Sequence, residues 1–121
     1  MGYFLLTIKI HYTDNIKISN KLDDFCRNLH STIVEVIKTD IHTCRTLIYP
    51  CKTYIVGASS SNFDGFIQLE IDILPGRSPK LRKLLGNILL TDLKSLCNDS
   101  DVSIDYRVIV NETDTEFYFG L

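Results

Sequence analysis

The order of strands and helices constrains the fold of this chain more than any other feature, because the same order occurs twice. In the first half, residues 4–10 alternate between apolar and other side chains, as in a half-buried strand. A helical apolar pattern follows, with Ser19 or Asn20 as its predicted N-cap. Residues 44–49 then predict a second strand, which we expect Pro50 to end.

The second half repeats this order without a clear repeat of the sequence. Residues 66–74 alternate again, with their aliphatic side chains on one face of a predicted strand. Ser78 predicts an N-cap and Pro79 a first helical position, so a helix begins here, and its leucine stripe ends near Cys97. Residues 102–110 predict the fourth main strand. Two further short extended pieces are expected, at residues 52–56 and 116–119.

The doubled order predicts one sheet covered by one layer of helices. A strand–helix–strand unit normally makes a right-handed crossover between parallel neighbours. The chain is therefore predicted to be a single α+β (α/β) domain over residues 1–121, with tandem β-α-β units, a four-stranded mixed sheet and both helices on one face. Association often buries an uncovered second face, so the sequence predicts an oligomer. The side chains expected on that face are mixed in character: Leu5, Thr7, Phe66, Gln68 and Ile109.

Composition argues against several classes of function. Of the 121 residues, 45% are hydrophobic and 23% are charged, and the net charge of −2 gives no basic footprint for nucleic acid or a membrane surface. The apolar start has no basic region before it and no stretch is long enough to span a membrane, so we expect a cytoplasmic protein. Neither the four cysteines nor the three histidines have metal-site spacing. We expect free thiols rather than a Cys44–Cys51 disulfide.

A short motif precedes the second helix. The residues from Ile73 to Ser78 read Ile-Leu-Pro-Gly-Arg-Ser, and in a chain of two strand–helix–strand units this turn resembles that of the 5-carboxymethyl-2-hydroxymuconate isomerases. These enzymes belong to the tautomerase superfamily, with 4-oxalocrotonate tautomerase and macrophage migration inhibitory factor. Asp14-Asn15-Ile16 is similar to the family's Asp-Asn-Ile, and Arg45 lies roughly where the family has arginines in its second strand. The resemblance covers nearly the whole chain in element order.

The resemblance implies a tautomerase-like fold and a homotrimer whose three sheets pack into a barrel-like core, with sites between subunits. It implies enol–keto isomerisation of an unsaturated dicarboxylate without a cofactor. The family's base is an N-terminal proline, whose amine pKa is lowered by burial and nearby cations so that it can move a proton between carbons. The ligand would be a small anionic carboxylate. Arg77, which matches the motif, and Arg45 are then the implied substrate-binding residues.

The sequence departs from the family at that base. Gly2 follows Met1, no proline precedes Pro50, and alignment of the Asp-Asn-Ile motifs places the family's proline near Leu6. The prolyl chemistry is therefore not carried over, and we expect proline-dependent activity to be weak or absent. Two other groups are candidate catalytic residues for proton transfer, namely the Gly2 amine and His11 at the end of the first strand.

Each candidate also has a simpler interpretation. Arg77 stands with Lys80, Arg82 and Lys83 at a helix start, where cations oppose the helix dipole. The group is therefore either an anion site or a solvated basic face. Arg45 is either a pocket residue or an exposed strand arginine. His11 is either a proton shuttle or an exposed histidine at a strand end. Three tyrosines either donate a hydrogen bond to an enolate or simply pack as aromatic side chains: Tyr3, Tyr106 and Tyr118.

Two classes of function stay open at this point. One is an isomerase-like member of the 5-carboxymethyl-2-hydroxymuconate isomerase family by descent, which includes the case of a pseudoenzyme without proline-dependent activity. The other is a non-catalytic trimeric binding or structural protein that retains an anion-binding pocket. A different proton-transfer enzyme, using the Gly2 amine or His11, is a third interpretation. Turnover of an enol substrate separates the catalytic interpretations from the binding protein.

Overall fold

The computed structural model describes residues 4–58 and 64–121. Its elements are, in chain order, β1 (Leu6–Thr13), α1 (Leu22–Ile37), η1 (Ile41–Thr43), β2 (Cys44–Cys51), β3 (Gly65–Ile73), α2 (Pro79–Leu96), β4 (Ile104–Glu112) and η2 (Thr115–Phe117). The two η elements are single 3₁₀ turns.

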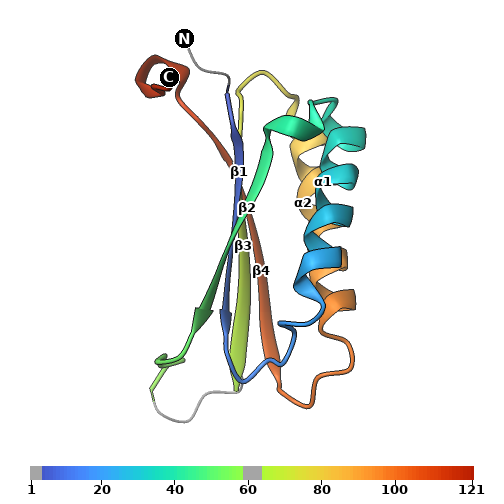
Figure 1. The fold of residues 1–121 in the computed structure, drawn as a ribbon, viewed down its shortest axis with the longest axis vertical. Helices are drawn as coiled ribbons and strands as arrows, with labels where there is room; N and C mark the ends of the chain where they lie inside the picture. The colour runs from blue at the N-terminus through green and yellow to red at the C-terminus, as the bar shows by residue number, and fades with distance from the viewer. Residues whose placement is uncertain (1–3, 59–63) are drawn as a thin grey trace.

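The four strands form one sheet in the order β2-β1-β3-β4. β1 runs parallel to β2 and antiparallel to β3, and β3 runs parallel to β4. Both helices lie on the same side of this sheet (Figure 1). The predicted four-stranded mixed sheet with two helices on one face is therefore confirmed. No helix in the described part of the chain is long and apolar enough to cross a membrane.

The helix-facing side of the two central strands is aliphatic or aromatic from Leu6 to Tyr12 of β1 and from Ile67 to Ile73 of β3. Its side chains have 0% exposure at Ile8 and Ile10 of β1 and at four positions of β3: Ile67, Leu69, Ile71 and Ile73. They pack against leucine and isoleucine side chains of the two helices, among them Leu29, Ile33, Leu85, Leu89 and Leu93. The period-two pattern in the sequence therefore predicted the buried face correctly.

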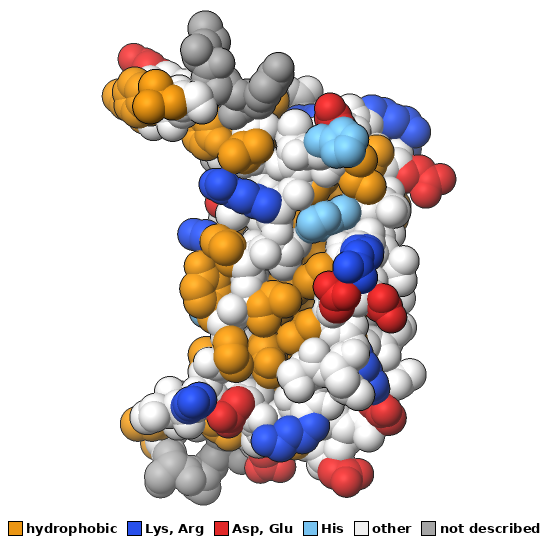
Figure 2. Space-filling model, in the orientation of Figure 1, with side chains coloured by type: hydrophobic (Ala, Val, Ile, Leu, Met, Phe, Trp, Pro, Cys, Tyr) orange, Lys and Arg blue, Asp and Glu red, His pale blue; other side chains and the backbone are white. Residues whose placement is uncertain are grey.

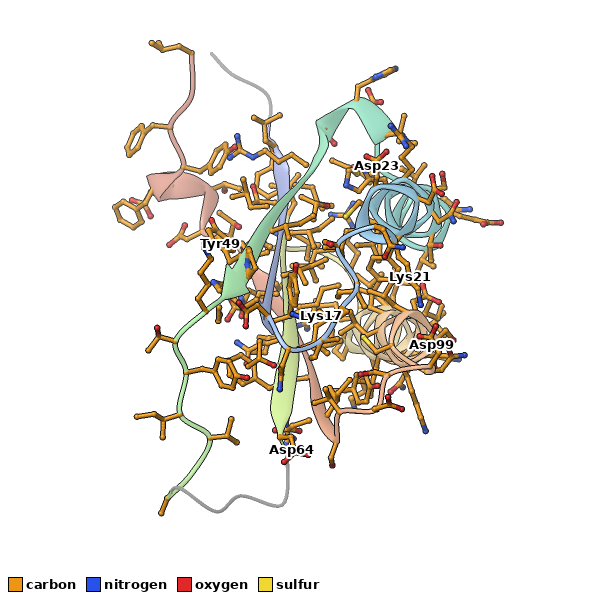
Figure 3. The ribbon with its side chains drawn as sticks, turned by 60° about the horizontal axis from the view of Figure 1, so that its bottom comes forward. Lys17, Lys21, Asp23, Tyr49, Asp64 and Asp99 are labelled. Atoms are coloured by element: carbon orange, nitrogen blue, oxygen red, sulfur yellow. The ribbon has the colours of Figure 1, made fainter. Side chains whose placement is uncertain are left out.

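The two helices begin in different ways. Ser78 Oγ accepts a hydrogen bond from the Leu81 backbone N–H at 3.1 Å, so the predicted cap and the Pro79 start of α2 are confirmed. The cap predicted for α1 at Ser19 or Asn20 is wrong, because α1 begins at Leu22 and its N-cap is Lys21, whose side chain makes no capping bond. The Lys21 ammonium instead pairs with Asp99 at 2.8 Å, which joins the start of α1 to the loop after α2 (Figure 3).

The edge strand β2 runs past Pro50 to Cys51, so the predicted stop at Pro50 is wrong. Only β1 pairs with β2, and a proline at the free edge costs no ladder hydrogen bond. The edge is poorly covered, with Ile48 37% exposed although it faces the helix side, and hydrophobic side chains appear along this margin in Figure 2.

The two short strands expected from the sequence are absent from the described residues. Neither residues 52–56 nor residues 116–119 form a strand, because the first piece has no strand partner and the second contains the end of η2. All four cysteines are free, in agreement with the expectation of free thiols. Cys97 is buried, and burial raises the pKa of its thiol to about 11, so it stays protonated and unreactive.

A glycine is required where the last residue of β1, Thr13, closely approaches the first residue of β3, Gly65. The hydroxyl of Thr13, which is fully buried, accepts a hydrogen bond from the Phe66 backbone N–H at 3.2 Å. A Cβ at Gly65 would lie 2.4 Å from Thr13 Oγ1, closer than any side chain can tolerate. Gly65 therefore fixes how tightly the loop before β3 joins the sheet.

We predict that Gly65→Ala lowers the free energy of unfolding by about 2 kcal/mol, because Thr13 must move and its hydrogen bond is strained. Urea denaturation measures this effect. Gly86→Ala in α2 is the matched control, since a Cβ there meets only Val110 Cγ2 at 3.6 Å. Its better helix propensity should raise stability by up to about 1 kcal/mol. Equal effects of the two substitutions would contradict the steric argument.

A second prediction concerns His30, whose Nε2 lies 2.7 Å from Thr46 Oγ1 and joins α1 to the edge strand. Burial lowers the pKa of His30 from its ordinary value of 6.5, so the unfolded chain binds this proton more readily than the folded chain. The free energy of unfolding should therefore fall as the pH drops below about 6.5, until the pH passes the lowered folded pKa. His30→Gln should reduce that slope in urea denaturation between pH 7.5 and 5. His42→Gln, on the exposed η1 turn, is the matched control for the loss of a histidine away from the contact with Thr46.

Candidate functional site

Polar and aromatic side chains gather at the amino-terminal end of β1. Parallel pairing sets Arg45 of β2 beside Thr7, and Arg45 Nε donates to Thr7 Oγ1 at 3.0 Å. The Thr7 hydroxyl can donate in turn to the Leu5 carbonyl at 3.4 Å. Both side chains lie on the face of the sheet turned away from the helices, because Leu6 and Ile8, which flank Thr7 in β1, point into the core, and Arg45 is paired with Thr7. We call this side the open face.

The carboxyl-terminal segment closes over the same end. The Tyr118 hydroxyl accepts a hydrogen bond from the Leu5 backbone N–H at 3.0 Å, and its ring packs on Phe4 with centroids 5.0 Å apart. The segment before β1 and the segment with η2 lie close together there (Figure 1). Because the phenol oxygen acts as the acceptor for Leu5, its own proton remains available to another group. The expected aromatic packing of Tyr118 is confirmed.

A carboxylate and an amide lie on the other side of Thr7. Antiparallel pairing sets Asp72 of β3 opposite Thr7, and parallel pairing sets Asn111 of β4 beside Asp72. Asn111 Nδ2 donates to Asp72 Oδ1 at 3.2 Å. The row across the four strands therefore reads Arg45, Thr7, Asp72 and Asn111, with the cation at one margin of the sheet and the carboxylate nearer the other.

Arg77 lies at the same end of the sheet but makes its contacts with the backbone. Its guanidinium donates to the carbonyls of Leu74, at 3.3 Å, and of Ile37, at 3.2 Å. Ile37 is the last residue of α1, so Arg77 satisfies a free carbonyl at the negative end of that helix. This explains why a cation precedes α2, whose own dipole it opposes. The structure shows no contact between Arg77 and Arg45 among the described residues.

The other members of the basic cluster do not converge on one point. Arg82 Nη1 lies 3.4 Å from the Glu112 carboxylate at the end of β4. Lys80 and Lys83 are exposed. For these three residues the interpretation as a solvated or paired basic face therefore fits the structure better than an anion site.

His11 lies on the open face near the opposite end of β1. Its ring stacks on Tyr49 of β2, with centroids 4.5 Å apart and planes inclined by 10°. Tyr49 lies on the side of the sheet away from the helices (Figure 3). His11 lies four positions after Thr7, a span of roughly 13 Å along a strand. His11 and Arg45 are therefore not brought together within one chain.

The remaining candidate, Gly2, lies outside the described residues, as does Tyr3. No cluster of three or more His, Cys, Asp or Glu side chains in the described ranges is arranged to hold a metal ion. What the described groups offer is a guanidinium, a threonine hydroxyl and a phenol proton at one strand end. Such a set can bind a carboxylate and donate a hydrogen bond to a second oxygen.

Sequence reasoning missed Thr7, Asp72 and Asn111 as neighbours of Arg45. Their meeting depends on the register between strands that are far apart in the sequence, and no local motif records it. The alternation of each strand does place Thr7 on the open face, so part of this signal was readable.

Comparisons with known proteins agree with this fold. The sequence profile described as CHMI, 5-carboxymethyl-2-hydroxymuconate isomerase, matches residues 7–104. A crystal structure of a 5-carboxymethyl-2-hydroxymuconate isomerase from Deinococcus radiodurans R1 is similar, with a TM-score of 0.83, 17% identity and coverage of 99% of this chain and 93% of that one. The crystal structure of a 5-carboxymethyl-2-hydroxymuconate delta-isomerase is also similar, with a TM-score of 0.77 and 18% identity. The match covers 97% of this chain and 87% of that one. No curated protein matches the sequence.

We predict that Tyr118→Phe frees the segment before β1, because the Leu5 N–H loses its acceptor. Amide hydrogen exchange at Leu5 should become at least about tenfold faster, and the free energy of unfolding should fall by about 1 kcal/mol. Tyr49→Phe is the control, since its hydroxyl makes no hydrogen bond to the described part of the chain while its ring still stacks on His11. Unchanged exchange at Leu5 in Tyr118→Phe would show that the bond does not hold the segment.

Proposed function

Since the chain belongs to the 5-carboxymethyl-2-hydroxymuconate isomerase family, we propose that it takes an unsaturated dicarboxylate at the amino-terminal end of β1. The observation that carries the proposal is the state of Arg45, which is exposed on the open face and uses only Nε, in its bond to Thr7. Its two terminal nitrogens make no hydrogen bond or ion pair to the described residues. A guanidinium with two free nitrogens suits a carboxylate group.

The proposed reaction is enol–keto isomerisation, in which an enol oxygen loses its proton and a carbon of the conjugated system gains one. Negative charge develops on that oxygen during the transfer, so a hydrogen-bond donor aimed at it lowers the barrier. Tyr118 is the donor that we assign, because its hydroxyl proton is not used by the Leu5 bond. Arg45 would hold one substrate carboxylate and fix the orientation of the conjugated chain.

The group that moves the proton must differ from the one that the family uses. The family's prolyl amine would fall near Leu6, where this chain has a peptide nitrogen whose lone pair is delocalised into the amide. We therefore propose that proline-type activity is weak or absent. The Gly2 amine stays a candidate for the proton transfer, and His11 would have to act from the far end of β1 or from another subunit.

We also propose that the protein is a cytoplasmic homotrimer that needs no cofactor. A trimer would cover the open face, which the helices leave uncovered. Its half-buried Phe66 and exposed Ile109 fit a surface that is covered on association. Four free thiols fit a reducing compartment.

The alternative is a non-catalytic trimeric binding or structural protein that retains the anion pocket. It is favoured by one observation, the lack of a proline at the position that would align with the family's base. It differs from the first proposal only in turnover, so binding and catalysis must be measured separately.

The test follows the ketonisation of phenylenolpyruvate and of 2-hydroxymuconate by the purified protein, and their binding by calorimetry. Turnover within about tenfold of a relative with an N-terminal proline, a gap of about 1.4 kcal/mol in barrier, would contradict the loss of proline-type activity. Binding without turnover would support the binding protein. Absence of both would contradict the proposed ligand class.

We predict that Arg45→Gln weakens the binding of 2-hydroxymuconate at least about tenfold, because it removes the unused guanidinium nitrogens. Arg107→Gln is the matched control, since Arg107 is an open-face cation on β4 that already pairs with Asp105 at 3.0 Å. That variant should bind within about twofold of the wild type. Equal losses in the two variants would indicate general electrostatic attraction instead of a site at Arg45.

A further inference from the structure

Asp72 of β3 is a carboxylate on the open face to which the proposed function gives no role. Its neighbours in the strand, Ile71 and Ile73, are fully buried against the helices, so Asp72 points to the helix-free side of the sheet (Figure 1). Antiparallel pairing sets Asp72 opposite Thr7, whose hydroxyl accepts the hydrogen bond from Arg45 Nε at 3.0 Å. Asp72 therefore lies one strand, about 5 Å, from the residue that the Arg45 guanidinium contacts.

One oxygen of the Asp72 carboxylate is held and the other is open. Asn111 Nδ2 donates to Asp72 Oδ1 at 3.2 Å, which restricts the rotation of the carboxylate. In the part of the chain that the structure describes, Asp72 Oδ2 accepts no hydrogen bond and the carboxylate makes no ion pair, although the side chain is only half-exposed. An oriented carboxylate with an unoccupied oxygen can accept a proton from a group placed beside it.

The nearest other carboxylates already have partners. Glu112, at the end of β4, lies 3.4 Å from Arg82 Nη1. Glu70, two residues before Asp72 in β3, accepts a hydrogen bond from Gln68 Nε2 at 3.2 Å and belongs to the next row along the sheet. Among the described residues, Asp72 is therefore the carboxylate that shares a row with the proposed carboxylate-binding guanidinium.

We propose that Asp72 is the group that moves the proton in the enol–keto isomerisation. This role rests on the proposed function, because it requires the substrate carboxylate to be bound by Arg45. The carbons next to that carboxylate then lie over Thr7 and reach the open oxygen of Asp72 on the following strand. His11, the other described candidate, lies roughly 13 Å from Thr7 along β1.

The proton transfer balances between the substrate and this one side chain. In the first step the enol O–H bond breaks, its proton goes to Asp72 Oδ2, and the oxygen is left with the electron pair as an enolate. In the second step that pair forms the carbonyl, and the electrons of the carbon–carbon double bond take the proton back from the carboxyl group to form a C–H bond. The carboxylate is thereby restored. Tyr118, the donor assigned to the enol oxygen, stabilises the enolate between the two steps.

The experiment follows the ketonisation of phenylenolpyruvate, whose single carboxylate is bound by Arg45, in the wild type, Asp72→Asn and Asp72→Ser. Both variants remove the proton acceptor, so kcat should fall at least about a hundredfold. Calorimetry with the product, phenylpyruvate, should give a Kd within about threefold of the wild type, because Asp72 does not hold the carboxylate. Circular dichroism checks folding, and one folded variant of the two is sufficient.

A matched control and an isotope measurement separate proton transfer from a general effect of charge. Glu70→Gln removes the same charge from the same face of β3, two residues away, and should keep kcat within about twofold. Asp72→Glu keeps a carboxylate and should retain more turnover than Asp72→Asn. In D₂O, the wild type should deliver deuterium to one face of the methylene carbon of phenylpyruvate, trapped by reduction as it forms, because the proton comes from a fixed side chain.

The outcomes distinguish failure of this role from failure of the proposed function. Asp72 variants that turn over phenylenolpyruvate like the wild type would overturn the role of Asp72 and leave carboxylate binding at Arg45 standing. The same holds for equal losses of kcat in Asp72→Asn and Glu70→Gln, and for a wild type that binds phenylpyruvate but turns nothing over. A wild type that neither binds phenylpyruvate nor turns over the enol would overturn both.

Discussion

The structure depends on the aliphatic side of its two central strands, which has to be covered. Ile8, Ile10 and the four helix-facing side chains of β3 have no exposed surface. Full burial of each such side chain contributes about 1.5–3 kcal/mol, more than the 0–1 kcal/mol typical of a surface ion pair. One layer of two helices covers this side. Polar and charged residues of the strands are thereby confined to the open face and to the strand ends.

The same constraint locates the candidate site and separates two arginines that look equivalent in the sequence. Arg45 projects from the open face, and its two terminal nitrogens make no hydrogen bond or ion pair to the described residues. Arg77 lies between the end of α1 and the turn after β3, and its guanidinium donates hydrogen bonds to backbone carbonyls of both. Arg77, which matches the family motif, thus stabilises the fold in this chain. Arg45, which no motif marks in the sequence, has a guanidinium placed to bind a ligand.

Much of the fold could be predicted from the sequence, because alternation and capping are local. The buried face of β3 and the Ser78 cap are examples. Predictions from local patterns were wrong where contacts between distant parts of the sequence determine where an element begins or ends. Pro50 continues β2 only because that strand has a free edge, and α1 starts without a side-chain cap although capping residues stand nearby. The neighbours of Arg45 depend on strand register, which no short motif encodes.

The central claim is that a dicarboxylate binds beside Arg45 at the amino-terminal end of β1. An NMR titration with 2-hydroxymuconate that follows the side-chain Nε–H groups of arginine and the backbone amides tests it most directly. Saturable shifts are expected at Arg45 Nε and at the Leu5 amide, which is hydrogen-bonded to Tyr118, with Arg77 Nε unaffected. Saturable shifts at Arg77 with none at Arg45 would contradict it.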